Sequence, residues 1–154
     1  MKAVIQRVKS AELSIDEKLV SSIGPGYVVY LGVGENDTQK QAEFLADKVA
    51  KLRIFEDQNG KMNNSLASLV SEGKSYSILV VSNFTLYGAC KGQNRPSFMS
   101  AAKPDVANEL YEYFCSKINE KYNIEVKTGV FGADMQILAA CDGPVNIILD
   151  TQEL

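Results

Sequence analysis

The segment Tyr27–Val33 constrains the fold most strongly, because it is apolar throughout. A strand with one face in water alternates apolar and polar residues, whereas an unbroken apolar run is typical of a strand covered on both faces. The segment Tyr76–Ser82 has the same buried character. Two such strands favour an α/β protein, in which helices cover the sheet.

Two segments are predicted to form the main helices. Asp37-Thr38 can cap a helix that extends to about Leu52, and Pro104 can start another that continues to about Tyr122. The spacing that supports these helices is carried by Phe44, Leu45, Lys48, Val49 and Leu52 in the first, and by Val106, Leu110, Tyr113, Phe114, Ile118 and Tyr122 on the inward face of the second.

The remaining segments predict a β-rich domain. Residues 2–8 alternate as a strand, and Leu13, Ile15, Leu19 and Ile23 fit a hairpin that turns at Asp16-Glu17. Further along the chain we expect short strands at Leu52–Phe55, Ile124–Lys127, Met135–Ala140 and Val145–Leu149, a short helix at Ser65–Val70 and a turn at Asp57–Gly60.

A chain of 154 residues is long enough for one domain with a real core and too short for two ordinary domains. We therefore predict a single α/β domain over residues 1–154, with a mixed sheet and two main helices. No apolar run approaches the roughly 18 residues of a membrane helix. The N-terminal segment alternates apolar and polar residues, so we expect no signal peptide and no membrane association.

The three cysteines, Cys90, Cys115 and Cys141, are widely spaced and form no CxxC motif. This pattern indicates reduced thiols in a cytoplasmic protein rather than a disulfide framework or a zinc site. The net charge of −3 and the isoelectric point near 5.0 do not favour a nucleic-acid partner through the global field. Any such partner would need a local basic patch.

The chain contains no histidine, which excludes Ser-His-Asp and Cys-His catalysis. It also has no Walker loop and no GxGxxG motif, so we expect no nucleotide cofactor and no metal. An enzyme built from this sequence would work with hydroxyl groups, backbone groups, lysine or arginine, or with groups on its own substrate.

Three segments are candidates for function. Ser82–Gly88 follows a buried strand, where ligands commonly meet α/β sheets, although composition alone favours a strand end that satisfies its own hydrogen bonds. Lys91–Phe98 could contact phosphates and bases, or be a solvated loop. Gly143-Pro144 could form a cis peptide that presents two carbonyl groups, or a hairpin turn between the two final strands.

Five co-linear segments together resemble the D-aminoacyl-tRNA deacylase family, also called D-tyrosyl-tRNA deacylase. The resemblance spans the whole chain without a large insertion, and each segment alone would be weak. The segments are VIQRVKSAELSI, LVVSNFTLYG, KGQNRPSF, TGVFGADMQI and DGPVNIILD.

The resemblance implies a homodimer with a strongly curved, barrel-like sheet, which hydrolyses the ester between a D-amino acid and the 3′-terminal adenosine of tRNA. It implies that Gly143 and Pro144 form a cis peptide that enters the active site of the other subunit and excludes L-amino acids. Arg7 matches the arginine that holds this motif, and Met135 matches a methionine packed nearby. The apolar segments Tyr27–Val33 and Ile147–Leu149 would suit the dimer interface.

The segment Ser82–Leu86 matches the other signature of the family, with agreement at Ser82, Phe84, Thr85 and Leu86. The resemblance implies that the catalytic residues are Ser82, Asn83, Phe84 and Thr85. Thr85 is a nucleophile by residue type, but the chain offers no base to activate it. We expect backbone N–H groups around Phe84 and Thr85 to form an oxyanion hole, assisted by the 2′-hydroxyl group of the terminal ribose. Lys91 and Arg95, with Lys103, would lie near the phosphates of the tRNA 3′ end.

Three positions depart from the family pattern. Asn83 replaces glutamine, and Cys141 and Asn146 replace the asparagine and threonine that flank Asp-Gly-Pro-Val. These departures leave open a sister-type deacylase with relaxed chirality and a trans Gly-Pro. A non-catalytic RNA-binding or scaffold protein on the same fold is the competing class. An esterase for small substrates is disfavoured by the missing nucleophile and base.

Overall fold

The long strand β1 organises the fold, which the computed structural model describes for residues 1–154. The structure has eight strands, three α-helices and one short 3-10 helix. The strands are β1 (Lys2–Ile15), β2 (Lys18–Ile23), β3 (Gly26–Gly32), β4 (Phe55–Glu56), β5 (Met62–Asn64), β6 (Ser77–Ser82), β7 (Glu125–Thr128) and β8 (Gln136–Asp150). The helices are α1 (Gln39–Lys51), α2 (Leu66–Ser71), η1 (Phe84–Tyr87) and α3 (Pro104–Tyr122).

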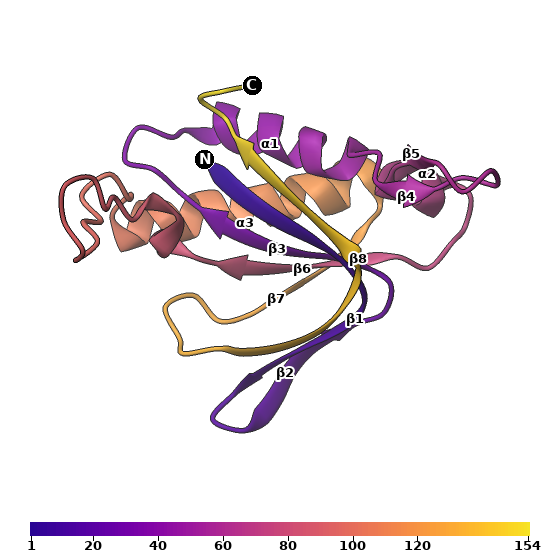
Figure 1. Ribbon diagram of the computed structural model, residues 1–154, viewed down its shortest axis with the longest axis horizontal. Coiled ribbons are helices and arrows are strands. Elements are labelled where there is room, and N and C mark those ends of the chain that lie inside the picture. The colour runs from indigo at the N-terminus through magenta and orange to yellow at the C-terminus, as the bar shows by residue number, and fades with distance from the viewer.

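One edge of β1 bonds to two different strands. Residues 2–8 pair with β3, residues 11–15 pair with β2, and β8 runs antiparallel along the opposite edge. The sheet therefore curls, so that β2 reaches back toward β7, where the Ser21 hydroxyl donates to the Thr128 carbonyl at 2.5 Å. Figure 1 shows the curl, with the β1–β2 hairpin bent away from the helices. The predicted curved, mixed sheet is confirmed as a nearly closed, barrel-like sheet.

The curl creates two apolar clusters, one on each face of β3 and β6. The larger contains 26 buried residues between the sheet and helices α1 and α3. The smaller contains seven buried residues inside the curl. The prediction that Tyr27–Val33 is covered on both faces is therefore confirmed. A second prediction for this segment, that it forms the dimer interface, is wrong. The segment lies between β1 and β6 and is buried apart from half-buried Tyr30.

The ends of the two main helices agree with the prediction more closely than their buried faces do. Thr38 caps α1, and a capping box with Gln41 satisfies the first turn. Pro104 begins α3, and Asn123 ends it in a left-handed conformation. The inward face of α3 is rotated from the prediction, because Ala107, Tyr111 and Cys115 share the stripe with Leu110, Phe114 and Ile118. Val106 is exposed, and Tyr113 and Tyr122 are half-buried at its edge.

Two predicted hairpins have different outcomes. The turn at Asp16-Glu17 is confirmed, since both residues have positive φ angles and Ile15 pairs with Lys18. The hairpin at Gly143-Pro144 is wrong. The strands predicted at 135–140 and 145–149 are halves of one strand, β8, and both halves pair with β1. Residues 142–145 bulge opposite Arg7, because Cys141 pairs with Val8 and Asn146 with Gln6.

The shorter elements also refine the prediction. The helix predicted at Ser65–Val70 is α2, which is capped by Ser65, and the turn at Asp57–Gly60 closes with a hydrogen bond from Gly60 N–H to the Asp57 carbonyl. The strand predicted at Leu52–Phe55 is wrong for its first residues, because β4 contains only Phe55 and Glu56. None of the helices is long and apolar enough to cross a membrane.

We predict that Gly26→Ala strongly destabilises the protein. A Cβ at Gly26 would lie 1.8 Å from the Ser77 carbonyl oxygen, where β3 meets β6, and φ at this position is +156°. The free energy of unfolding should fall by about 3 kcal/mol, measured by urea denaturation. Gly24→Ala is the matched control, because nothing lies within 4 Å of its Cβ. It should change the same quantity by less than about 1 kcal/mol, and equal effects would contradict the steric argument.

Candidate active site

A pocket opens where the parallel strands β3 and β6 end. Carboxyl ends of neighbouring parallel strands meet at one edge of a sheet, which is the usual place for a ligand in an α/β protein. The cavity has a volume of about 190 Å³. Its walls come from both strand ends, η1, α3 and the segment before β8: Leu31, Val33, Ser82, Asn83, Phe84, Ala107, Tyr111, Phe131, Gly132, Ala133 and Met135.

Asn83 shapes the signature segment. It has an extended backbone and precedes η1, and its side-chain oxygen accepts from the Thr85 N–H at 3.1 Å. The Thr85 hydroxyl also donates to this oxygen. Asparagine is among the best residues at the position that precedes a helix, because its short side chain reaches the first unpaired N–H groups. Asn83 therefore has a local structural use.

These contacts decide which groups near the pocket are free to act. The Thr85 N–H and hydroxyl are both held by Asn83, and an amide oxygen is not a base that could activate the hydroxyl. The expectation that Thr85 N–H points into an oxyanion hole is therefore not met in this structure. Phe84 is the first residue of η1, so its N–H has no carbonyl partner inside the helix.

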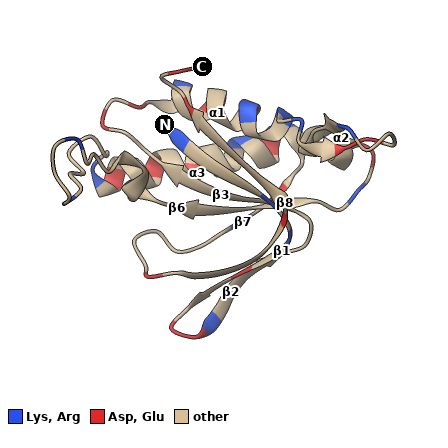
Figure 2. Cartoon of the chain, viewed as in Figure 1, with Lys and Arg blue, Asp and Glu red and all other residues tan.

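The polar loop after η1 folds back over Phe84. Ala89 and Ser97 exchange two backbone hydrogen bonds, and Phe98 packs edge-on against Phe84 with ring centroids 5.0 Å apart. Lys91 and Arg95 lie in the exposed turn between these contacts. Figure 2 shows cationic segments in this loop between β6 and α3. Lys91 and Arg95 thus lie on the same loop as Phe98, which packs against the pocket residue Phe84.

Met135 joins the pocket rather than the Gly-Pro segment of its own chain. Its sulfur lies so close to Gly129 that a Cβ there would be 2.4 Å away. Sequence reasoning missed Tyr111 and Phe131 as wall residues, although Phe131 stands in a segment that carried the resemblance. The Tyr111 hydroxyl donates to the Val80 carbonyl at 2.8 Å, and burial raises the pKa of this phenol above its ordinary value.

Arg7 holds the bulge that contains Gly143-Pro144. Its Nη1 donates to the Ile54 carbonyl at 2.6 Å, and its Nε donates to the Asp142 carbonyl at 3.2 Å and lies 3.1 Å from the Asp142 carboxylate. Arg7 itself is only 6% exposed. The peptide bond between Gly143 and Pro144 is cis, and both residues are exposed. The predicted contact between Arg7 and this motif is present.

The Gly-Pro bulge and the pocket are separate within one chain. Arg7 pairs with Tyr27, which pairs with Ile78, whereas Ser82 lies four residues further along β6. Four strand residues span roughly 13 Å. Neither Gly143 nor Pro144 lines the pocket. Within a single chain, the pocket and the bulge therefore face different surroundings.

The structure contains no group of three or more His, Cys, Asp and Glu side chains that could hold a metal ion. Cys90 and Cys141 are exposed thiols, while Cys115 lies on the buried face of α3. Burial raises the pKa of Cys115 to about 12, so this thiol stays protonated and unreactive at neutral pH.

Comparisons with known proteins agree over nearly the whole chain. The family model described as D-Tyr-tRNA(Tyr) deacylase matches residues 4–150. Proteins named D-aminoacyl-tRNA deacylase from Thermosipho melanesiensis and Bacillus pumilus are 47% and 48% identical. The first match covers 100% of this chain and 99% of the relative, and the second covers 99% and 100%.

Two solved structures share the fold. One, titled c-Myc DNA Unwinding Element Binding Protein, has a TM-score of 0.88 at 38% identity and covers 97% of this chain and 98% of its own. The other, titled as a probable eukaryotic D-amino acid tRNA deacylase, has a TM-score of 0.80 at 20% identity and covers 96% and 97%. On the family model and the full-length relatives, this chain belongs to the D-Tyr-tRNA(Tyr) deacylase family.

Proposed function

We propose that this protein is a chiral proofreading enzyme that hydrolyses the ester bond of D-aminoacyl-tRNA and releases a free D-amino acid and tRNA. The observation that carries the proposal is the pocket at the ends of β3 and β6, which is lined by Phe84, the first residue of η1, in a chain whose full-length relatives are named D-aminoacyl-tRNA deacylase. The three free cysteines suit a cytoplasmic setting.

The reaction needs no protein base. A water molecule attacks the ester carbonyl carbon, and the oxygen that becomes negative accepts a hydrogen bond from the Phe84 N–H. The bond from carbon to the ribose 3′-oxygen then breaks, and that oxygen takes up the proton that the water gives off. The vicinal 2′-hydroxyl group of the ribose positions the water. One such donor contributes about 3–4 kcal/mol to the stability of the transition state.

Chirality is selected by a second copy of the chain. Gly143 and Pro144 are exposed and remote from their own pocket, so in a homodimer they are free to enter the pocket of the partner. Their carbonyl groups would accept from the substrate amino group, and the rigid bulge would exclude an L side chain. Arg7 holds the bulge through Asp142 and Ile54.

Exposed apolar side chains on β8 support this homodimer. Ile148 is 75% exposed and Leu138 is 74% exposed, which is unusual for large apolar side chains on one strand of a folded domain. Ile148 lies a few residues from Pro144, so a contact between copies at this face would carry the bulge toward the partner. Of the predicted Ile147–Leu149 interface this assignment keeps Ile148, because Leu149 is buried in the core and Ile147 packs against that core.

The tRNA 3′ end would be held by the loop that follows η1. Lys91 and Arg95 are exposed cations on this loop, and the exposed Phe84 ring offers a stacking surface beside them. Because the net charge of the chain is −3, a local contact of this kind suits the protein better than a broad electrostatic surface.

A second function is a binding protein without catalysis. The solved structure titled c-Myc DNA Unwinding Element Binding Protein favours it, because that title names nucleic-acid binding. The two functions separate in one assay, in which the purified protein is given D-tyrosyl-tRNA and L-tyrosyl-tRNA with a chelator present. Loss of the D-ester alone supports the deacylase, and binding without loss of either ester supports the second function.

We predict that Phe84→Pro abolishes most of the turnover of D-tyrosyl-tRNA. Proline fits the first position of a helix but has no N–H, so this change removes the proposed donor and leaves η1 in place. Phe84→Ala is the control, because it removes the same ring and keeps the N–H. Single-turnover rates should differ by about 100-fold or more between the two variants.

Equal single-turnover rates in these two variants would exclude the Phe84 N–H as the donor. Thr85→Ala gives a further comparison, because its hydroxyl is already bonded to Asn83. This variant should keep substantial turnover, and complete loss with an intact fold would restore Thr85 as a nucleophile.

We predict that Pro144→Ala weakens discrimination between the two tyrosyl esters. Alanine removes the ring that makes the bulge rigid, so an L side chain would be tolerated better. The ratio of kcat/KM for the D-ester to that for the L-ester should fall by about tenfold or more. Pro25→Ala, at an exposed proline in the turn before β3, should leave the ratio unchanged. An unchanged ratio in Pro144→Ala would count against the role of the bulge.

We predict that Ile148→Glu produces a monomer that has lost deacylation. A carboxylate at the centre of an apolar interface costs far more than it does on a free surface. Molar mass by light scattering and the rate on D-tyrosyl-tRNA report the two effects. Leu19→Glu, at a 60% exposed leucine on β2, is the matched control and should change neither. An active Ile148→Glu monomer would rule out a site shared between copies.

A further inference from the structure

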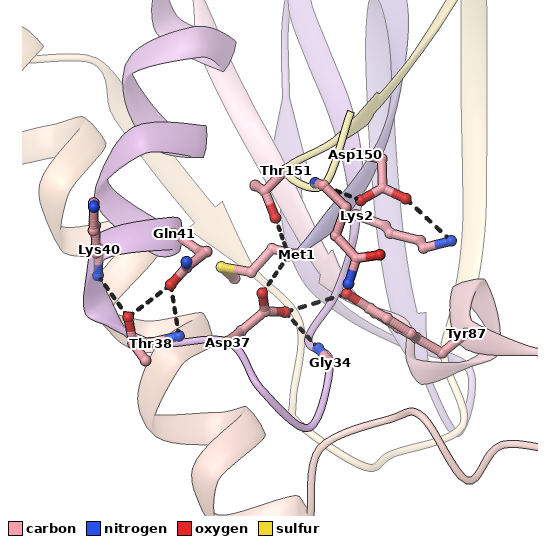
Figure 3. Close-up of polar contacts among 11 residues, drawn as sticks. Met1, Lys2, Gly34, Asp37, Thr38, Lys40, Gln41, Tyr87, Asp150 and Thr151 are labelled. Atoms are coloured by element: carbon pink, nitrogen blue, oxygen red, sulfur yellow. Dashed lines mark hydrogen bonds and ion pairs between the residues drawn. The ribbon is translucent and has the colours of Figure 1, made fainter. Parts of the chain in front are cut away.

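The α-amino group of Met1 lies in a buried polar network (Figure 3). It donates to the Asp37 carboxylate at 2.6 Å and to the Thr151 hydroxyl. Thr151 also donates its backbone N–H to the Met1 carbonyl at 2.9 Å, so the amino group is fixed from the C-terminal side as well. Met1 is 0% exposed and the Asp37 side chain is 8% exposed.

Asp37 connects this amino group to η1. Its other carboxylate oxygen accepts from the Gly34 N–H at 2.6 Å and from the Tyr87 hydroxyl at 3.2 Å. Tyr87 is the last residue of η1 and is 9% exposed. Burial, with the Asp37 charge beside it, raises the pKa of Tyr87 above its ordinary value, so the phenol remains a donor at neutral pH.

The surroundings leave Tyr87 little freedom. A Cβ at Gly34 would lie 2.7 Å from the Tyr87 hydroxyl oxygen, so the glycine allows the close approach of the ring. The Lys2 ammonium lies 5.3 Å from the ring centroid. Since η1 is a single 3-10 turn with a rise of about 2 Å per residue, the position of Tyr87 also fixes that of Phe84, roughly 6 Å away.

We propose that the free α-amino group of Met1 is a positioning group for the reaction, acting through Asp37 and Tyr87 on the η1 segment. This inference rests on the proposed function, because it assigns a purpose to the placement of the Phe84 N–H. A buried carboxylate without a cationic partner is costly, so loss of the ammonium charge forces Asp37 to move toward water. Asp37 then releases Tyr87, and η1 loses its anchor.

The network makes the proposed positioning sensitive to chemistry at the Met1 nitrogen. A formyl or acetyl group, or residues placed ahead of Met1, would turn the ammonium into a neutral amide. A neutral amide has a single N–H, whereas the ammonium donates to Asp37 and Thr151 together. The pocket walls and the Gly143-Pro144 bulge would stay in place, while the Phe84 N–H in η1 would be displaced.

The test compares three forms of the protein. The first has a free amino group at Met1, the second carries Gly-Ser ahead of Met1, and the third carries the same dipeptide after Leu154. Deacylation of D-tyrosyl-tRNA and amide hydrogen exchange of residues 84–88 are measured for each. The second form should lose about 10-fold to 100-fold in kcat with KM within about twofold, and its segment 84–88 should exchange faster. The third should match the first.

Asp37→Asn distinguishes charge pairing from simple crowding. The substitution should lower kcat when the amino group is free, and it should raise kcat in the form extended at Met1, because no uncompensated carboxylate then remains. If the extended chain does not fold, Tyr87→Phe in the first form tests the same link and should lower kcat with little change in KM.

Two results would overturn the proposal. One is a chain extended at Met1 with unchanged kcat and unchanged exchange at residues 84–88. The other, where that chain does not fold, is Tyr87→Phe with unchanged kcat. Failure of the proposed function has a different signature, because the form with the free amino group would then be inactive while the effect on exchange persisted.

Discussion

The sharing of β1 among three partners is the constraint on which the rest of the structure depends. Its first half must satisfy β3 and β8, and its second half must satisfy β2 and β8. β2 and β3 follow one another along one edge of β1 in the same register, while the ladder with β8 on the other edge shifts register on both sides of Val8, where the sheet bends. This bend separates the cluster under the helices from the cluster inside the curl. It also forces the bulge in β8 opposite Arg7, where the ladder between β1 and β8 loses its register.

The pocket and the bulge both follow from this geometry. The pocket forms where β3 and β6 end together, because the parallel pair brings Leu31 level with Ser82. The bulge forms near the opposite ends of the same strands, because Arg7 faces Tyr27 at the beginning of β3. In the proposed function, a short domain thus carries a reaction surface and a selecting surface on different sides, and a symmetric pair of chains would bring them together.

The sequence predicted most of the secondary-structure elements and part of the candidate site. What it could predict depends on neighbouring residues, and what it missed depends on distant ones. Apolar runs and caps depend on neighbours in the chain, so β3, β6 and the start of α1 could be located from Tyr27–Val33, Tyr76–Ser82 and Thr38. Pairing across a bulge depends on a distant strand. For that reason Gly143-Pro144 resembled a hairpin turn, although both flanking segments bond to β1.

The rest of the candidate site could not be read from single residues either. Tyr111 and Phe131 have the composition of core residues, and only the fold shows that they border a cavity. The hydrogen bonds from Thr85 to Asn83 depend on the backbone angles at the strand end. Short segments match a family well, but they do not reveal which of their N–H groups the chain already uses.

A donor in the main chain has a consequence for how such an enzyme changes over generations. The Phe84 N–H is present whatever side chain follows it, with proline as the exception, so no single codon encodes it. Selection on this group acts on the shape of the 83–87 turn, which several residues maintain together. Asn83 is an example, since its short side-chain amide caps the turn by its own geometry. Catalytic capacity of this kind is inherited as a conformation rather than as a residue.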